Sequence, residues 1–180
     1  MKKIILFALT LLCISIGANA QNATDGASQT TNLDLSNAIE IKFYSNTYGG
    51  TQTLSFNNVN DYANGKETGY QILIIRSNKD YNVTVKANAA NFSYSGTTSP
   101  APVMPISALN VSNYYNGTGG TVSSTFNNTY APMSAVDQNL ITDGKKGSFQ
   151  YFFTRYKATP GFAYPAGTYT AEIIYTATQQ

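Results

Sequence analysis

Few side chains of this sequence could do chemistry. Histidine and tryptophan are absent, and the single cysteine is Cys13. A Ser-His-Asp triad, a Cys-His pair and an imidazole metal site all need histidine, so the sequence excludes them. Neither a G-x-S-x-G nor an S-x-x-K motif occurs, which removes the common serine nucleophiles. Carboxylates and tyrosines are the groups that remain.

The carboxylates are expected on the solvent-exposed faces of strands or in turns. A glycosidase needs two facing carboxylates roughly 5–9 Å apart, but Glu40 and Glu172 both fall on the polar face of alternating segments. Other acidic residues lie in turn-rich segments, and no D-x-[DN]-x-[DN]-G calcium loop is present. We therefore predict no catalytic residue, no metal and no cofactor, and a protein that is not an enzyme.

Two adjacent tyrosines are the exception. Tyr114 and Tyr115 lie in Asn113–Gly120 (NYYNGTGG), whose composition predicts a loop. Their rings could stack on a sugar while the amides of Asn113 and Asn116 bind its hydroxyls. The alternative is that the rings fold back as a lid over one end of the domain. The tyrosines in predicted strands are expected in the core with their hydroxyls at the rim: Tyr81, Tyr151, Tyr169 and Tyr175.

Residues 1–20 have the three parts of a secretory signal peptide. Lys2 and Lys3 precede an apolar stretch, Ile4–Ile16, and a small-x-small site ends at Ala20. Lipidation of Cys13 is the competing interpretation. The apolar stretch is too short to span a membrane, and no later segment has the ~20 apolar residues required. We expect an exported protein in the periplasm, at the cell surface or outside the cell.

Charge and cysteine content constrain the mature chain. Of eleven Lys and Arg residues, two lie in the signal, which leaves nine against nine Asp and Glu. A neutral chain gives no electrostatic reason to expect nucleic acid as a partner. Loss of Cys13 leaves no cysteine, so stability must come from the core. About 160 residues suffice for one such domain, because roughly two-thirds of the unfolded surface can then be buried.

Alternation with a period of two predicts strands along residues 33–180, which we expect to form one domain. Short strands separated by turns, with no long helical period, are typical of an all-β, Ig-like antiparallel β-sandwich. We expect the clearest hairpin at residues 70–87 and turns at residues 57–69. The predicted strands are 33–43, 51–56, 70–76, 81–87, 105–112, 134–142, 149–157 and the closing stretch within 164–180.

The first of these strands has a second possible role. Its apolar residues all occupy odd positions, and a flexible polar arm, residues 21–32, is predicted to precede it. Such a segment could be an ordinary first strand or could be donated to the sheet edge of another subunit. The candidate assembly residues are Leu33, Leu35, Ile39, Ile41 and Phe43.

The closing stretch resembles known surface domains. Pro165–Thr170 (PAGTYT), followed by alternating residues, resembles the last strand of spore-coat-protein-U-type, fimbrial-subunit and WxL-type domains. Residues 76–87 (RSNKDYNVTVKA) are more loosely similar. The sequence lacks the tryptophan of the WxL motif and the cysteine pair of many fimbrial subunits. The resemblance implies a bacterial cell-surface structural module with no catalytic residue.

Two functions remain open at this level. One is a secreted, adhesive or fimbria-like structural subunit that assembles with itself or with another surface subunit by strand exchange. The other is a monomeric carbohydrate-binding module that contacts a glycan through Tyr114 and Tyr115.

We expect the exported protein to begin at Gln21, because cleavage should follow Ala20. Intact mass spectrometry of the secreted chain measures this. A mass that includes Met1, or one that carries a lipid on Cys13, would contradict it.

Overall fold

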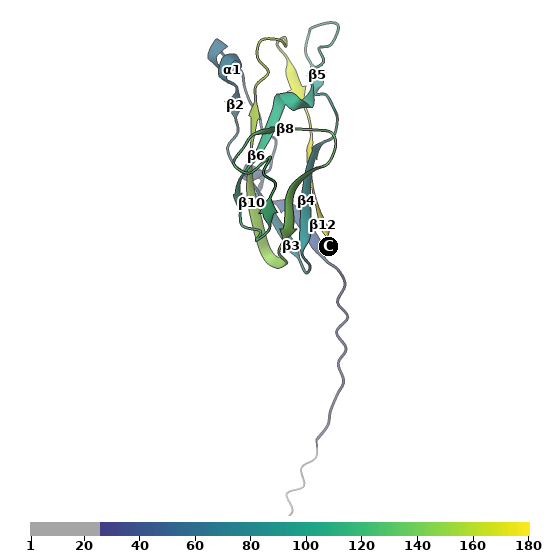
Figure 1. Ribbon diagram of the computed structural model, residues 1–180. Helices are drawn as coiled ribbons and strands as arrows, with labels where there is room; N and C mark the ends of the chain where they lie inside the picture. Colours follow the sequence, from purple (N-terminus) through teal and green to yellow (C-terminus); the bar gives the residue numbers. More distant parts are fainter. Residues whose placement is uncertain (1–25) are drawn as a thin grey trace, which may run out of the picture. The chain divides into compact units, whose positions relative to one another are not determined.

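A computed structural model describes residues 26–180 (Figure 1). The predicted signal peptide and residues 21–25 of the predicted arm lie outside the described residues. Residues 26–34 contain no helix or strand and are exposed, and a compact unit spans Leu35–Gln180. No helix in the described part of the chain is long and apolar enough to cross a membrane.

The compact unit is an antiparallel β-sandwich, which confirms the predicted fold class. In Figure 1, β10 and β6 lie in the left-hand layer, and β4 and β12 lie in the right-hand layer. One sheet has the order β1-β3-β10-β6-β8, with β2 also pairing with β10, and the other has the order β12-β4-β9-β7. A separate small sheet joins β5 to β11.

The strand bounds of the first sheet are Ile39–Phe43 (β1), Lys66–Glu67 (β2), Gln71–Ser77 (β3), Leu109–Asn116 (β6), Ala131–Pro132 (β8) and Gly147–Ala158 (β10). Those of the second are Tyr81–Ala87 (β4), Thr121–Val122 (β7), Gln138–Gly144 (β9) and Ile173–Gln179 (β12), and the small sheet holds Ser93–Ser95 (β5) and Thr168–Thr170 (β11). Short helices span Asn46–Tyr48 (η1), Val59–Asn64 (α1) and Ile106–Ala108 (η2).

Alternating side chains build the core between the two sheets. In β4 the odd positions are buried and the even positions are only half-buried, as predicted. In β3 the run Leu73–Ile75 is buried throughout, as expected for a strand that lies between two neighbours, β1 and β10. The fully buried side chains include Leu73, Ile75, Tyr81, Val83, Val85, Val111, Phe126, Leu140, Ile141 and Phe152.

The predicted hairpin of β3 and β4 is wrong. β3 pairs with β1 and β10, whereas β4 pairs with β12 and β9. The connection at Asn78–Asp80 therefore carries the chain from one sheet to the other. A short turn between two alternating segments fits a hairpin and a sheet-to-sheet crossing equally well, so the sequence pattern could not distinguish them.

Residues 33–67 differ from the prediction in three places. The first strand begins at Ile39, and residues 51–56 form no strand although Leu54 and Phe56 are half-buried. The predicted turns include α1, whose first turn is capped because the Asn58 side chain accepts from the Asp61 amide and Asp61 accepts in return. Gly65 ends this helix with a φ of 75°, a conformation that glycine adopts without steric cost.

Three later segments are shifted. The strand predicted at 105–112 lies at Leu109–Asn116, after the short helix η2, so part of the predicted loop belongs to β6. The strand predicted at 134–142 begins at Gln138. The closing stretch is divided into β11 and β12, and the interruption lets the chain leave the small sheet and join the second sheet.

A chain of hydroxyls crosses the core between the sheets. The Tyr156 and Tyr175 hydroxyl oxygens are 2.8 Å apart, and the Tyr175 hydroxyl donates to the Thr154 hydroxyl at 3.1 Å. Tyr156 and Thr154 are buried residues of β10. This pairing allows three polar groups to lie within an apolar core at little cost.

We expect Tyr175→Phe to lower the free energy of unfolding by about 1–3 kcal/mol, because it leaves buried hydroxyls short of a partner. Tyr81→Phe is the matched control. The Tyr81 hydroxyl is buried and has no hydrogen-bond partner in the described residues, so its removal should leave stability unchanged or raise it. Urea unfolding of both variants measures this, and equal losses would contradict the assignment.

We expect stability to fall at alkaline pH. Burial raises the pKa of Tyr175 to about 12, and burial followed by the nearby Asp80 carboxylate raises the pKa of Tyr81 to about 12. A folded pKa above the unfolded value of about 10 stabilises the fold fully below pH ~10, and this contribution is lost as the pH rises toward 12. The melting temperature should fall less steeply for the Tyr81→Phe/Tyr175→Phe double variant; identical slopes would contradict this.

Candidate functional site

The residues predicted to contact a glycan do not form a loop. All four lie on β6, where Asn113 is buried and the Asn116 side chain donates to the Gly120 carbonyl at 2.8 Å. Tyr114 and Tyr115 are both exposed, because the ladder with β10 skips Tyr114 in a bulge. Such a bulge lets successive side chains face the same side of a sheet. The two tyrosines are therefore surface residues of a strand, and the two asparagines serve the fold.

The side of the sandwich formed by β1 and β12 is open. Each of these strands ends the order of its sheet, so β1 pairs only with β3 and β12 pairs only with β4. The ladders of the described residues do not join β1 to β12. We call this side of the sandwich the open edge.

Unpaired backbone groups follow the open edge. The Tyr44 amide donates to the Ile72 carbonyl and the Asn78 amide donates to the Ala38 carbonyl. In an antiparallel ladder, alternate residues point their N–H and C=O groups to opposite sides. In β1 the even residues therefore face β3, and the groups of Ile39, Ile41 and Phe43 face the open edge.

The same alternation applies to β12. The Asn88 amide donates to the Glu172 carbonyl, and the Gln180 amide donates to the Asp80 carbonyl, so the even residues face β4. The backbone groups of the odd residues face the open edge: Ile173, Tyr175, Ala177 and Gln179. A row of unpaired groups of this kind is a template for another strand.

The core is incompletely covered along this side. Inward-facing residues of the inner strands, such as Ile75 and Val83, are fully buried. Those of the two edge strands are only half-buried and pack against the core: Ile41, Phe43, Ile173, Tyr175 and Ala177. Between the two edge strands, the Phe43 and Tyr175 rings meet edge to face with centroids 6.2 Å apart.

One end of the open edge is held by a single side chain. The Gln179 amide nitrogen donates to the Ala38 carbonyl at 2.9 Å, to the Ser77 hydroxyl at 3.0 Å and to the Asn78 side-chain oxygen at 2.9 Å. These contacts tie the last residue of β12 to the first sheet, and they set the spacing of the two edge strands at that end.

β12 lacks the usual protection of an edge strand. Natural sheets protect exposed edges with proline, charged side chains or bulges. The sequence of β12 is IIYTATQ, which contains neither proline nor a charged residue, and its ladder with β4 runs without a register shift from Ile173 to Gln179. An unprotected edge of seven residues is suited to pairing with another chain.

The candidate assembly residues fall into two groups. Ile39, Ile41 and Phe43 form β1 and pair with β3 of their own chain. Leu33 and Leu35 belong to no strand, and their exposed fractions are 83% and 88%. The segment that stays available for donation is therefore shorter than the predicted strand and ends before β1.

Several carboxylates form ion pairs at the surface. Glu40 lies 3.0 Å from the Lys42 ammonium and 3.8 Å from the Arg76 guanidinium. Asp80 accepts from the Lys145 ammonium at 2.9 Å, and the pKa of Asp80 is lowered first by the Lys146 amide and then by Lys145. No group of three or more potential metal ligands lies together within residues 26–180.

Comparisons with known proteins identify no family for this chain. No family model matches the sequence, and no curated protein is significantly similar to it. A solved structure of a chaperone–usher pilus aligns with 89% of this chain and with 100% of its own chain, at 9% sequence identity and a TM-score of 0.39. A TM-score this low does not establish a shared function.

Proposed function

We propose that this protein is a non-enzymatic structural subunit of the bacterial cell surface, which assembles when the arm of one copy adds a strand to the open edge of another. The observation that carries the proposal is the row of unpaired backbone groups on β12 beside a half-covered core. The predicted signal peptide and the resemblance of the closing stretch to surface domains agree with export.

Backbone pairing would supply most of the affinity. An added strand satisfies N–H and C=O groups along an edge, and pockets for alternate side chains supply specificity. On β12 the available groups belong to Ile173, Tyr175, Ala177 and Gln179, which together span the whole strand. Because these groups are regularly spaced, an incoming strand can pair along the entire edge.

The arm has side chains that match the core. Leu33 and Leu35 are two residues apart, so in an extended strand both would point to the same side. Full burial of a leucine side chain stabilises a protein by about 1.5–3 kcal/mol. Both side chains are exposed in the single chain, so insertion beside Ile173 and Tyr175 of another copy would bury them and complete the coverage of its core.

We expect the Leu33→Asp/Leu35→Asp double variant to stay monomeric at concentrations at which the mature protein forms oligomers, because a charge would enter the core of the neighbour. Its melting temperature should match that of the parent subunit in monomeric form, since both residues are exposed. Val136→Asp, which changes another exposed aliphatic residue, is the control and should still assemble. Sedimentation velocity over a concentration series measures the outcome.

A peptide experiment tests the edge directly. A synthetic peptide of residues 26–38, added to the double variant at 100 times its Kd, should stabilise it by about 2.7 kcal/mol. The same peptide with aspartate at positions 33 and 35 should not. Ala177→Pro removes an outward N–H without disturbing the ladder with β4, so it should reduce peptide binding in a folded subunit. A parent protein that stays monomeric and ignores the peptide would refute the proposal.

A further inference from the structure

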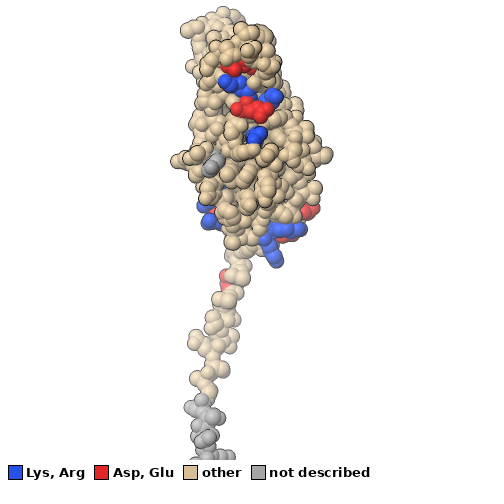
Figure 2. Space-filling model, turned by 90° about the vertical axis from the view of Figure 1, so that its left-hand side faces the viewer, with Lys and Arg blue, Asp and Glu red and all other residues tan. Residues whose placement is uncertain are grey.

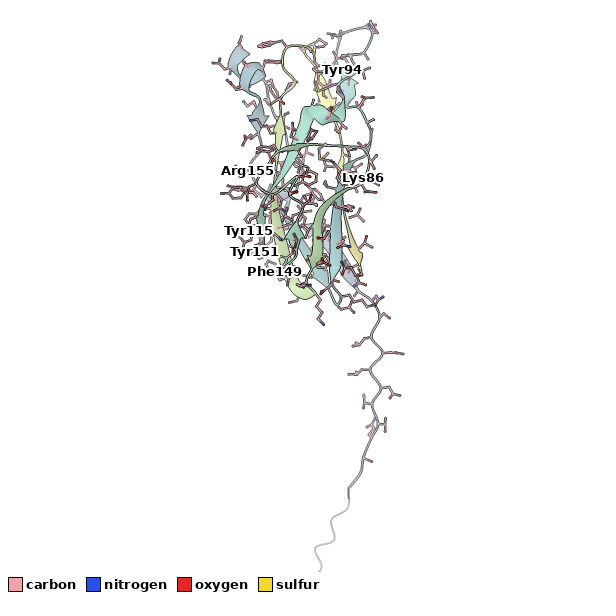
Figure 3. All side chains as sticks on the ribbon, in the orientation of Figure 1. Lys86, Tyr94, Tyr115, Phe149, Tyr151 and Arg155 are labelled. Atoms are coloured by element: carbon pink, nitrogen blue, oxygen red, sulfur yellow. The ribbon has the colours of Figure 1, made fainter. Side chains whose placement is uncertain are left out.

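The outer face of the first sheet carries aromatic rings that the core does not use. In β10 the inward residues are Phe152, Thr154 and Tyr156, which are buried. The residues between them face outward. Phe149, Tyr151 and Phe153 of β10, together with Tyr115 of β6, form what we call the aromatic row. Figure 3 shows Phe149, Tyr151 and Tyr115 on the same side of the molecule.

The rings of the aromatic row are evenly spaced. Along β10 the centroids of Phe149 and Tyr151 are 5.6 Å apart, and those of Tyr151 and Phe153 are 5.8 Å apart. The Tyr115 ring stacks on Tyr151 at 5.6 Å with an angle of 18° between the planes, and lies 5.2 Å from Phe153. Alternation along a strand produces this spacing, because every second residue faces the same side.

The aromatic row is accessible and hollowed. Phe149 is 52% exposed and Tyr115 is 45% exposed, whereas Tyr151 and Phe153 are half-buried. Tyr44, Ile72, Phe149, Tyr151 and Phe153 line a shallow hollow of about 180 Å³. This is smaller than the ~300–1,000 Å³ of a pocket that encloses a small molecule. It suits a ligand that lies on the surface with one face against the rings.

The fold does not explain this surface. The solvent face of an antiparallel sheet is normally polar, and β4 follows this rule with Asn82, Thr84 and Lys86 on its outer side. Exposed apolar surface on a soluble domain marks a place of interaction. β10 instead has aromatic residues on its outer face as well as in the core.

The distribution of charged residues around the aromatic row favours an uncharged ligand. Figure 2 shows an uncharged expanse of the surface with groups of charged residues above and below it. The cation nearest in sequence, Arg155, has its guanidinium 3.9 Å from the Tyr70 ring centroid and 4.6 Å from that of Tyr114. A nucleic acid or an acidic polymer would need cations along the row itself.

The size of the row disfavours a second copy of the protein. A stable protein interface uses about 20–30 residues on each side, whereas the row has four side chains. A sugar chain needs far fewer contacting side chains, because each pyranose has an apolar C–H face that stacks on one aromatic ring. Regular ring spacing on the scale of one sugar unit fits a polymer with a regular repeat.

We propose that the aromatic row binds an uncharged polysaccharide chain that lies along β10. The rings of Phe149, Tyr151 and Phe153 contact successive sugar units, and the hydroxyls of Tyr115 and Tyr151 bind sugar hydroxyls at the side. The neighbouring hydroxyl of Tyr115 raises the pKa of Tyr151. This site does not depend on strand exchange, because the open edge lies on other strands.

The test is affinity electrophoresis of the mature protein in gels that contain hydroxyethyl cellulose, xylan, a soluble β-1,3-glucan or alginate, together with pull-down on cellulose and chitin. We expect retention by at least one neutral polymer and none by alginate. Phe149→Thr/Tyr151→Thr keeps residues that favour strands and should weaken retention at least about tenfold, since stacking on the two rings together contributes more than this.

Phe162→Thr is the matched control. Phe162 is exposed and stacks on Tyr62, away from β10, so its replacement should leave retention unchanged. The melting temperatures of all variants establish that they are folded, and Phe149→Thr alone is the substitute if the double variant is not. No retention of the parent protein by any neutral polymer, retention by alginate alone, or equal retention of the double variant would overturn the proposal. The Leu33→Asp/Leu35→Asp variant should be retained normally, which separates this site from assembly.

Discussion

Backbone hydrogen bonding at the sheet edges is the constraint on which the rest of this structure depends. Every inner strand has neighbours on both sides, whereas β1 and β12 each have one. A buried N–H or C=O group without a partner is costly, so an edge must face water or another strand. Here the two edges lie beside each other, and the apolar residues that they turn toward the core are only half-buried. Water can hydrogen-bond to the backbone groups there, but it does not bury the apolar side chains behind them. An added strand would do both.

The same reasoning explains the two faces of β10. This strand lies between β3 and β6, so its backbone is paired on both sides and it can accept no further strand. Its inner face supplies Phe152 and Tyr156 to the core. Its outer face is therefore free to vary without effect on pairing, and it carries the aromatic row. The proposed assembly edge and the proposed binding face lie on different strands, so neither proposal depends on the other.

The sequence predicted the fold class and most strands because period-two alternation reports directly on burial, as in Tyr81–Ala87. It misplaced elements where alternation describes a single segment, whereas the pairing of that segment depends on strands elsewhere in the chain. The turn at Asn78–Asp80 fits a hairpin or a crossing between sheets, and only the strand order determines which. The rings of FQYFFTRYK occur at both odd and even positions, which indicates aromatic side chains on both faces of the strand. Tyr151 was instead expected in the core, because a single strand pattern does not say which parity faces inward.

The candidate edge could be predicted only in part. The alternation of Leu33 through Phe43 marks an apolar strand but not its partner, and the structure divides it because Ile39–Phe43 find β3 within the same chain. The chain has one cysteine and so cannot form an internal disulfide; its stability must come from burial and hydrogen bonds. Because β1 and β12 bury their inner residues only halfway, the unpaired subunit is less stable than the fold permits. The proposed strand addition would bury these residues, so the half-burial that leaves the edge exposed is also the reason that an added strand should stabilise the subunit.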